Sequence, residues 1–192
     1  MDRAGIPHLT VTELAKLIET KQVSPVEAVE AYLDRIEQVN PVVNAYVTVC
    51  AEEARRDARQ AEEEIQQGHY RGPLHGVPVA IKDQIHTKGI RTTDGSKLRA
   101  TFVPEEDATV MANLKKAGAI LLGKLNMSEF ALGDPVSSAS GAARNPWDLE
   151  RSPGTSSTGS GAATAAHLCA TSLGEDTGGS IRGLAANCGL VG

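Results

Sequence analysis

Two glycine-rich segments hold the serines whose surroundings could support chemistry: residues 152–161 (SPGTSSTGSG) and residues 174–182 (GEDTGGSIR). In the second segment small residues precede Ser180, which opens a predicted helix. Consecutive backbone N–H groups there could converge on a developing oxyanion. Glycines would also let a substrate carbonyl approach the backbone closely. The pattern predicts Ser180 as a candidate nucleophile, and its alternative interpretation is a serine that only caps a helix.

A serine nucleophile needs a base, and a lysine fits this sequence better than a histidine. The histidines fall in no recognisable triad pattern. Lys82 follows the wholly apolar run 77–81 (VPVAI), whose burial would favour the neutral amine. An amine that is half neutral at about pH 8 needs a pKa roughly 2.4 below the ordinary ~10.4, about 3.3 kcal/mol, which burial can supply. Lys82 is therefore the candidate base, with an ordinary surface lysine as the alternative.

Glycine-rich loops also bind phosphates, and cysteines can bind metals, but the sequence fits neither use well. The Walker pattern ends in Gly-Lys-Ser/Thr, which neither segment has. A dinucleotide fingerprint should follow the first strand of a βαβ unit with an acidic partner downstream, and both segments fit that pattern poorly. Cys50, Cys169 and Cys188 are far apart and form no zinc motif, so we expect free buried thiols in a reducing compartment.

Length and composition are those of an ordinary globular domain. The 192 residues, 41% of them hydrophobic and 22% charged, suffice for one domain with a core. The net charge of −5 argues against a general nucleic-acid binder. The N-terminus has no signal-peptide pattern and no apolar run is long enough to span a bilayer. We therefore expect a cytoplasmic protein without a membrane partner.

The sequence predicts a mostly helical structure for the first part of the chain, up to residue 67. Thr10–Glu13 and Ser24–Glu27 each match a capping box, and an apolar face with helical spacing follows the second one. Asn40-Pro41 should end that helix, and residues 43–50, rich in β-branched residues, should form a strand. A charged helix over 51–67 should follow.

After Gly76 the sequence pattern predicts strands that alternate with helices, which is typical of α/β sheets. The later elements are expected as follows: strands at 77–81, 120–122 and 171–174; helices at 107–117, 162–170 and 181–187; and a long loop region at 134–161. Long loops inside compact domains tend to carry function.

Three segments, in the same order along the chain, resemble the hallmarks of the amidase-signature family. They are residues 76–83 (GVPVAIKD), 152–161 and 176–182 (DTGGSIR). Residues 123–127 (GKLNM) and 144–148 (RNPWD) resemble connecting segments of that family. The likeness runs over nearly the whole chain.

The resemblance implies an α/β fold with a mixed central sheet flanked by helices. Residues 1–192 would be the N-terminal portion of one amidase domain, with 1–70 as a mostly helical lead-in and 71–192 as the catalytic core portion. The chain stops at residues 188–192, shortly after Ser180, where the family continues with a long stretch. We therefore expect a chain that is truncated at its C-terminus and a poor hydrolase by itself.

Residue by residue, the resemblance implies Lys82 as the catalytic lysine, Ser156 as the bridging serine, associated with an unusual cis peptide bond, and Ser180 as the acyl-accepting nucleophile. The oxyanion hole would be formed by the backbone N–H groups of Thr177, Gly178, Gly179 and Ser180. Supporting positions would be Asp176 and Arg182, with Ser157 as a loop hydrogen-bonder. Three residues depart from the family's usual pattern and leave substrate preference open: Thr155 and Thr158, where glycine is usual, and Glu175, where threonine is common.

The implied activity is hydrolysis of a small-molecule amide through an acyl-enzyme, with no metal or organic cofactor and with a homo-oligomer as a possible assembly. One alternative is the glutaminase subunit of a tRNA-dependent amidotransferase, the only case in which a nucleic acid would be a partner. The other is a truncated, inactive chain that serves as a binding or assembly module.

Overall fold

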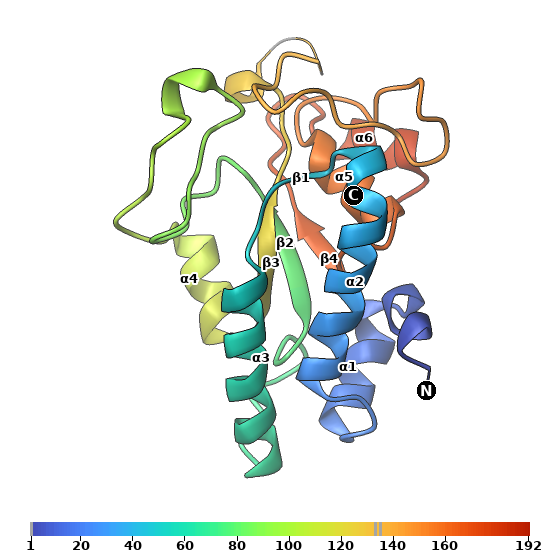
Figure 1. The fold of residues 1–192 in the computed structure, drawn as a ribbon, viewed down its shortest axis with the longest axis vertical. Helices are drawn as coiled ribbons and strands as arrows, with labels where there is room; N and C mark the ends of the chain where they lie inside the picture. Colours follow the sequence, from blue (N-terminus) through green and yellow to red (C-terminus); the bar gives the residue numbers. More distant parts are fainter. Residues whose placement is uncertain (1, 133, 135) are drawn as a thin grey trace.

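The computed structural model describes residues 2–132, 134 and 136–192; Pro135, within the expected 134–161 loop, lies outside the described residues. Helices and strands alternate along the chain as an α/β pattern (Figure 1). The α-helices are α1 (Val11–Glu19), α2 (Pro25–Val43), α3 (Ala51–Gln66), α4 (Thr109–Lys116), α5 (Thr158–Ala165) and α6 (Arg182–Cys188). The strands are β1 (Tyr46–Val49), β2 (Pro78–Lys82), β3 (Ile120–Leu125) and β4 (Thr171–Leu173). Short 3-10 helices occur at Arg3–His8, Lys97–Arg99 and Glu129–Ala131.

The four strands form one mixed sheet in the order β1-β3-β2-β4. β1 runs antiparallel to β3, whereas β2 is parallel to both of its neighbours, β3 and β4. The predicted α/β class with a mixed central sheet and flanking helices is therefore confirmed. The parallel pairing of β2 and β4 matters most here, because the carboxyl ends of parallel strands meet at one edge of a sheet.

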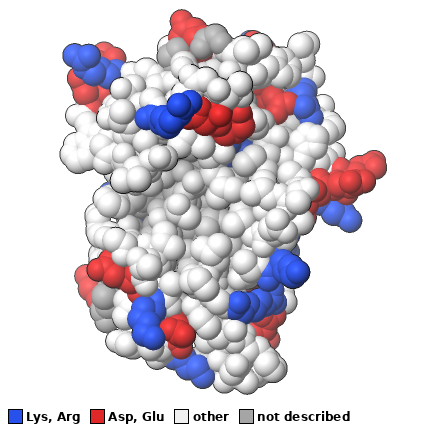
Figure 2. Space-filling view, turned by 180° about the vertical axis from the view of Figure 1, so that it is seen from behind, with Lys and Arg blue, Asp and Glu red and all other residues white. Residues whose placement is uncertain are grey.

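The sheet separates two hydrophobic cores of unequal size. Ile120 and Leu122 of β3 belong to the larger core, which includes apolar residues of α1, α2, α3 and α5. Leu121, between them, belongs to a small core with Ile81 and with Met111 of α4. This alternation is expected because successive side chains of a strand point to opposite faces. The view from behind shows that the middle of the face opposite α2 and α3 carries few charged side chains and is hollowed (Figure 2).

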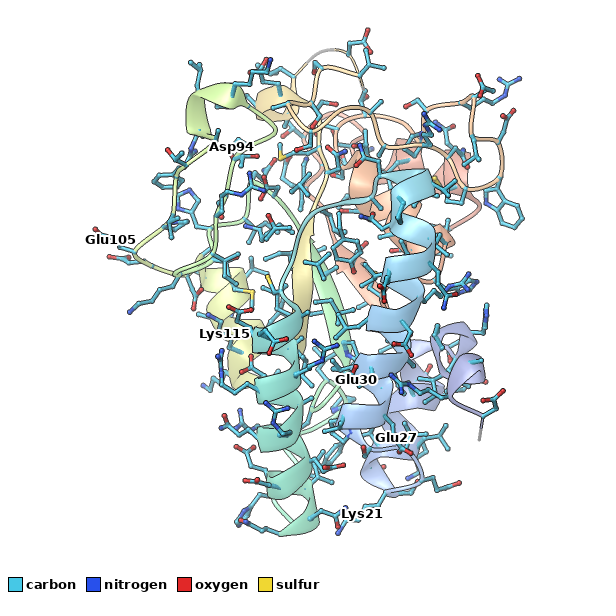
Figure 3. The ribbon with its side chains drawn as sticks, viewed as in Figure 1. Lys21, Glu27, Glu30, Asp94, Glu105 and Lys115 are labelled. Atoms are coloured by element: carbon cyan, nitrogen blue, oxygen red, sulfur yellow. The ribbon has the colours of Figure 1, made fainter. Side chains whose placement is uncertain are left out.

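Both predicted capping boxes are confirmed. The Ser24 hydroxyl accepts a hydrogen bond from the Glu27 N–H at 3.1 Å, and the Glu27 carboxylate accepts one from the Ser24 N–H at 2.8 Å. Thr10 and Glu13 make the same reciprocal pair at the start of α1. Glu27 lies at the N-terminal end of α2, far from the loops that follow the strands (Figure 3). These caps fix where the helices covering the larger core begin.

The end of α2 was predicted wrongly. The helix runs through Pro41 to Val43 and ends at Asn44, which has a left-handed φ of 50°. The Asn44 N–H still donates to the Asn40 carbonyl at 2.8 Å, so the proline in the last turn removes one helical hydrogen bond without ending the helix. The following strand starts at Tyr46 rather than 43.

A second boundary differs near the predicted site. α5 begins at Thr158, not at 162, so the expected loop region is shorter than its composition indicates. The helix start is buried among small residues, and packing overrides their low helix propensity. Within the described part of the chain no helix is both long and apolar enough to cross a membrane. The three cysteines are free and buried, as expected.

Candidate active site

The site lies where β2 and β4 end. Ile81 of β2 pairs with Leu173 of β4, so the residues that follow each strand emerge side by side. Lys82 is the last residue of β2, and the segment 174–180 begins directly after β4. Ser156, in the loop before α5, is brought to the same place.

The three predicted catalytic residues are joined by hydrogen bonds. Lys82 Nζ donates to Ser156 Oγ at 2.7 Å, and Ser156 Oγ donates to Ser180 Oγ at 3.2 Å. Lys82 and Ser156 are fully buried, whereas Ser180 is half-buried. The Thr155–Ser156 peptide bond is cis. A chain of hydrogen bonds, called the relay here, therefore joins a buried amine to a half-buried hydroxyl.

The environment of Lys82 favours its neutral form. Burial lowers the pKa of the Lys82 amine, and this is the largest influence on it. The Glu175 carboxylate, whose Oε2 lies 3.4 Å from Nζ, raises that pKa in part, and Asp176 does so more weakly. The balance remains a lowered pKa, which is what a lysine needs in order to accept a proton.

Ser156 is held by backbone contacts to the chain after β3. The Ser128 N–H donates to the Ser156 carbonyl at 3.0 Å, and the Gly159 N–H donates to the Asn126 carbonyl at 2.7 Å. Gly159 lies so close to this segment that a Cβ there would be 2.3 Å from Asn126 N and 2.4 Å from the carbonyl oxygen of Ala45. The glycine in the first turn of α5 is therefore required by a close backbone approach.

Asp176 organises the turn that carries Ser180. Its carboxylate accepts hydrogen bonds from the backbone N–H groups of Gly179, Ile181 and Arg182 at 2.6, 3.1 and 3.0 Å. The Arg182 guanidinium adds a two-pronged contact at 3.0 and 2.9 Å. The Arg182 side chain, followed by these N–H groups, holds the pKa of the Asp176 carboxyl well below its usual range. Both residues therefore fix the turn that carries Ser180, and their supporting role stays a prediction.

The predicted oxyanion hole has most of its donors free. The backbone N–H groups of Thr177, Gly178 and Ser180 have no hydrogen-bond acceptor among the described residues. The Gly179 N–H differs, because it already donates to Asp176. The hole stays a prediction, and in this structure three of its four N–H groups are available for an oxyanion.

Ser157 has the loop-bonding contacts expected for it. It is fully buried, and its hydroxyl donates to the Glu175 carbonyl at 3.2 Å. The Glu175 N–H donates back to the same hydroxyl at 3.4 Å. Ser157 therefore joins the start of α5 to the segment after β4.

Two features of the site were not predicted from the sequence. The first is the contact between Glu175 and Lys82, since Glu175 was noted only for its departure from a family pattern. The second is a buried pair beside the base: Lys124 Nζ lies 3.7 Å from Asp83 Oδ1 and donates to the Ile85 carbonyl at 2.7 Å. Burial lowers the pKa of Lys124 to about 8. One signal for this pair was present in the sequence: Lys124 follows the apolar run 120–122 after a single glycine, which indicates a buried lysine. A buried charge requires a partner of opposite charge.

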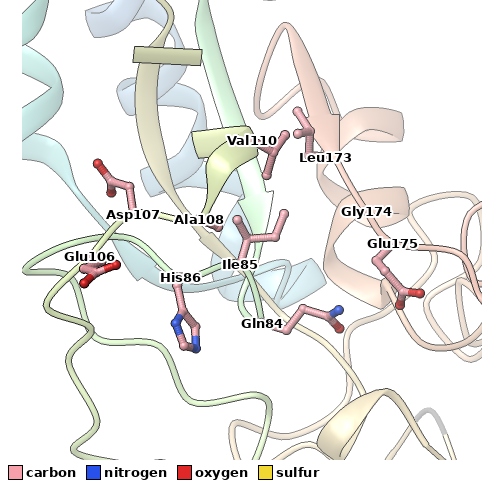
Figure 4. A pocket seen from close by; sticks show the side chains of 10 residues that line it. All are labelled: Gln84, Ile85, His86, Glu106, Asp107, Ala108, Val110, Leu173, Gly174 and Glu175. Atoms are coloured by element: carbon pink, nitrogen blue, oxygen red, sulfur yellow. The ribbon is translucent and has the colours of Figure 1, made fainter. Parts of the chain in front are cut away.

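Two neighbouring hollows open beside the relay. One, of about 440 Å³, is lined by residues after β2, at the start of α4 and after β4 (Figure 4). The other, of about 420 Å³, includes Thr177 and Phe130 in its lining. They share Gln84, His86 and Glu175, and Ser180 is absent from both linings. Their volumes suit a small organic ligand.

The chain has relatives among known proteins that share its sequence pattern. The family model described as Amidase matches residues 27–192. The chain is 54% identical over 185 residues to the A subunit of the glutamyl-tRNA(Gln) amidotransferase of Geobacter metallireducens. It is 50% identical over 186 residues to the corresponding protein of Carboxydothermus hydrogenoformans. Each match covers 96% of this chain, which spans 38% of the length of these curated relatives.

The fold is similar to that of a solved enzyme as well. The native peptide amidase from Stenotrophomonas maltophilia matches with a TM-score of 0.88 and 34% sequence identity. The match covers 92% of this chain and 38% of that one.

Proposed function

The chain belongs to the amidase family, and from this premise we propose that it carries the catalytic centre of an enzyme that hydrolyses the C–N bond of a carboxamide. The observation that carries the proposal is the continuous hydrogen-bonded path from Lys82 Nζ through Ser156 Oγ to Ser180 Oγ. A nucleophile and its base within hydrogen-bond reach are the signature of covalent catalysis. In this proposal residues 71–192 are the catalytic core portion and residues 1–70 the helical lead-in of one amidase domain, in the cytoplasm.

Acylation begins from the neutral form of Lys82. Ser180 Oγ attacks the amide carbon and passes its proton to Ser156 Oγ, while the Ser156 proton moves to Lys82 Nζ. The carbonyl π electrons move to oxygen, and the N–H groups of Thr177, Gly178 and Ser180 stabilise the resulting anion. Collapse of this intermediate breaks the C–N bond, and the leaving nitrogen takes the proton back through Ser156. Ammonia or an amine departs, and the acyl group remains bound to Ser180 as an ester.

Deacylation uses the same path with water in place of the amide nitrogen. Water gives its proton to Ser156 Oγ while the Ser156 proton moves to neutral Lys82, and the water oxygen forms the new bond to the ester carbon. Collapse of the second intermediate returns the proton to Ser180 and releases a carboxylic acid. Within the protein, the protons move along the Ser180–Ser156 contact of 3.2 Å and the Ser156–Lys82 contact of 2.7 Å.

A fluorophosphonate probe tests the nucleophile directly. In a complete version of this protein (the full chain) the probe should label Ser180, and Ser180→Ala should abolish both labelling and amide hydrolysis. Ser140→Ala is the matched control, because Ser140 is an exposed loop serine outside the relay. Labelling that persists in Ser180→Ala would remove Ser180 from its proposed role.

The similarity to the glutamyl-tRNA(Gln) amidotransferase relatives favours a second candidate function. In that case the same acylation would take place on glutamine and supply ammonia to a partner subunit. Glutamine hydrolysis that rises when partner subunits and charged tRNA are added would favour this function. Rapid hydrolysis of simple amides by the complete protein without partner subunits would favour the amidase.

A further inference from the structure

Glu175 contacts the base and the nucleophile turn at the same time. Its Oε2 lies 3.4 Å from Lys82 Nζ, and its Oε1 accepts a hydrogen bond from the Thr177 hydroxyl at 2.5 Å. Its backbone is fixed as well, through the two hydrogen bonds with Ser157 that join it to the start of α5. One side chain therefore connects the end of β2 with the segment that presents Ser180.

The proposal rests on the proposed function. We propose that Glu175 is a positioning residue for the base: it holds the Lys82 ammonium beside Ser156, ties it to the Thr177 turn, and sets the lower pH limit of the reaction. A neutral side chain at this position would supply no charge to the Lys82 amine.

Few other charges act on the base amine among the described residues. Asp176 is the second carboxylate that affects it, and the two-pronged contact with Arg182 largely neutralises that carboxylate. Asp83 follows the base in sequence, but its carboxylate accepts hydrogen bonds from Thr93 and pairs with Lys124. Glu175 is therefore the one uncompensated charge within ion-pair distance of the amine in the described part of the chain.

Removing the negative charge should make the base lose its proton at lower pH. An opposite charge within about 4–6 Å changes a pKa by about 1–3. We expect a pKa change at the lower end of this range, because the Glu175 side chain is 36% exposed and solvent screens its charge. Glu175→Gln should therefore move the acidic limb of kcat/KM down by about one pH unit. One pH unit below the wild-type midpoint, the variant should show about a fivefold larger share of its plateau rate.

The experiment compares pH profiles of kcat/KM for the full chain and three variants. Glu175→Gln loses the charge and keeps the shape, whereas Glu175→Asp keeps the charge and should retain a near wild-type limb. Glu105→Gln removes an equal charge from an exposed loop residue (Figure 3) that is not among the groups that shift the pKa of Lys82. A loss of stability alone would not raise the relative rate at low pH. An acidic limb in Glu175→Gln that coincides with the wild-type limb, or that moves equally in Glu105→Gln, would overturn the proposal.

Two further measurements keep the outcomes separate. The rate of fluorophosphonate labelling at Ser180 should show the same shift of its pH profile without any substrate. If Glu175→Gln does not fold, Glu175→Thr replaces it and should shift the limb in the same direction. Wild-type protein that is not labelled at Ser180 would refute the proposed function, whereas specific labelling with an unmoved limb would refute only the role of Glu175.

Discussion

Replacing Gly159 by alanine should displace the start of α5 and, with it, the loop that holds Ser156. The added Cβ would lie 2.3 Å from Asn126 N, 2.4 Å from Ala45 O and 2.8 Å from Asn126 O. These are backbone atoms next to β1 and β3, so they cannot rotate out of the way as the end of a side chain could. Relief must come from a shift of α5 itself.

The magnitude follows from two opposing effects. Overpacking a well-packed site typically costs about 1–3 kcal/mol, and contacts this short with backbone place Gly159 at the upper end. Alanine in a helix is favoured over glycine by about 1 kcal/mol, which offsets part of the loss. We expect a net loss of about 2 kcal/mol in the free energy of unfolding. A displacement approaching 1 Å at Ser156 would lower turnover by up to about a hundredfold.

Urea denaturation and amide hydrolysis by the full chain would measure both effects. Gly183→Ala is the matched control, because Gly183 also lies in a helix, α6, and a Cβ there meets nothing within 4 Å among the described residues. That variant should be as stable as wild type or slightly more stable. Equal stability and turnover in Gly159→Ala and wild type, or an equal loss in Gly183→Ala, would refute the reasoning.

Further outcomes are expected from the two buried lysines, Lys82 and Lys124. Burial lowers the pKa of Lys82, and a base acts in its neutral form, so kcat should rise with pH through that pKa and then level off. Lys82→Ala should lower kcat at least about a hundredfold, and a variant with most of its rate would require another base. Lys124→Met strands the buried Asp83 carboxylate and should cost about 3–5 kcal/mol of unfolding free energy, measured by chemical denaturation. The double variant Lys124→Met/Asp83→Asn should lose much less, and equal losses would contradict the pairing.

The parts of the fold and site that depend on local sequence could be predicted. The capping boxes at Thr10 and Ser24 are read from residues three positions apart, and the structure confirms both. The apolar run before Lys82 marks a buried strand, and the structure places β2 there with every residue buried. The motif order then indicated that Lys82, Ser156 and Ser180 belong to one site.

The remaining features depend on contacts between distant parts of the chain. Pro41 normally ends a helix, but the packing of α2 and the cap at Asn44 carry the helix beyond it. Glu175 is 93 positions from Lys82 in sequence, so its effect on the base becomes visible only when β2 and β4 are aligned. The Gly179 N–H was expected to face a substrate, and only the folded turn shows that it donates to Asp176.

The strand arrangement divides the proposed catalytic relay between elements of unequal burial and strand pairing. β2, which ends in Lys82, is fully buried and has a strand on each side. β4, which leads to Ser180, has three half-buried residues and pairs only with β2 in the described chain. Among the described residues, we therefore expect local opening of β4 to require less free energy than local opening of β2. If the proposed relay is catalytic, a contact that stabilises the outer side of β4 should raise the fraction of molecules in which Lys82, Ser156 and Ser180 are joined, without any change to these three residues.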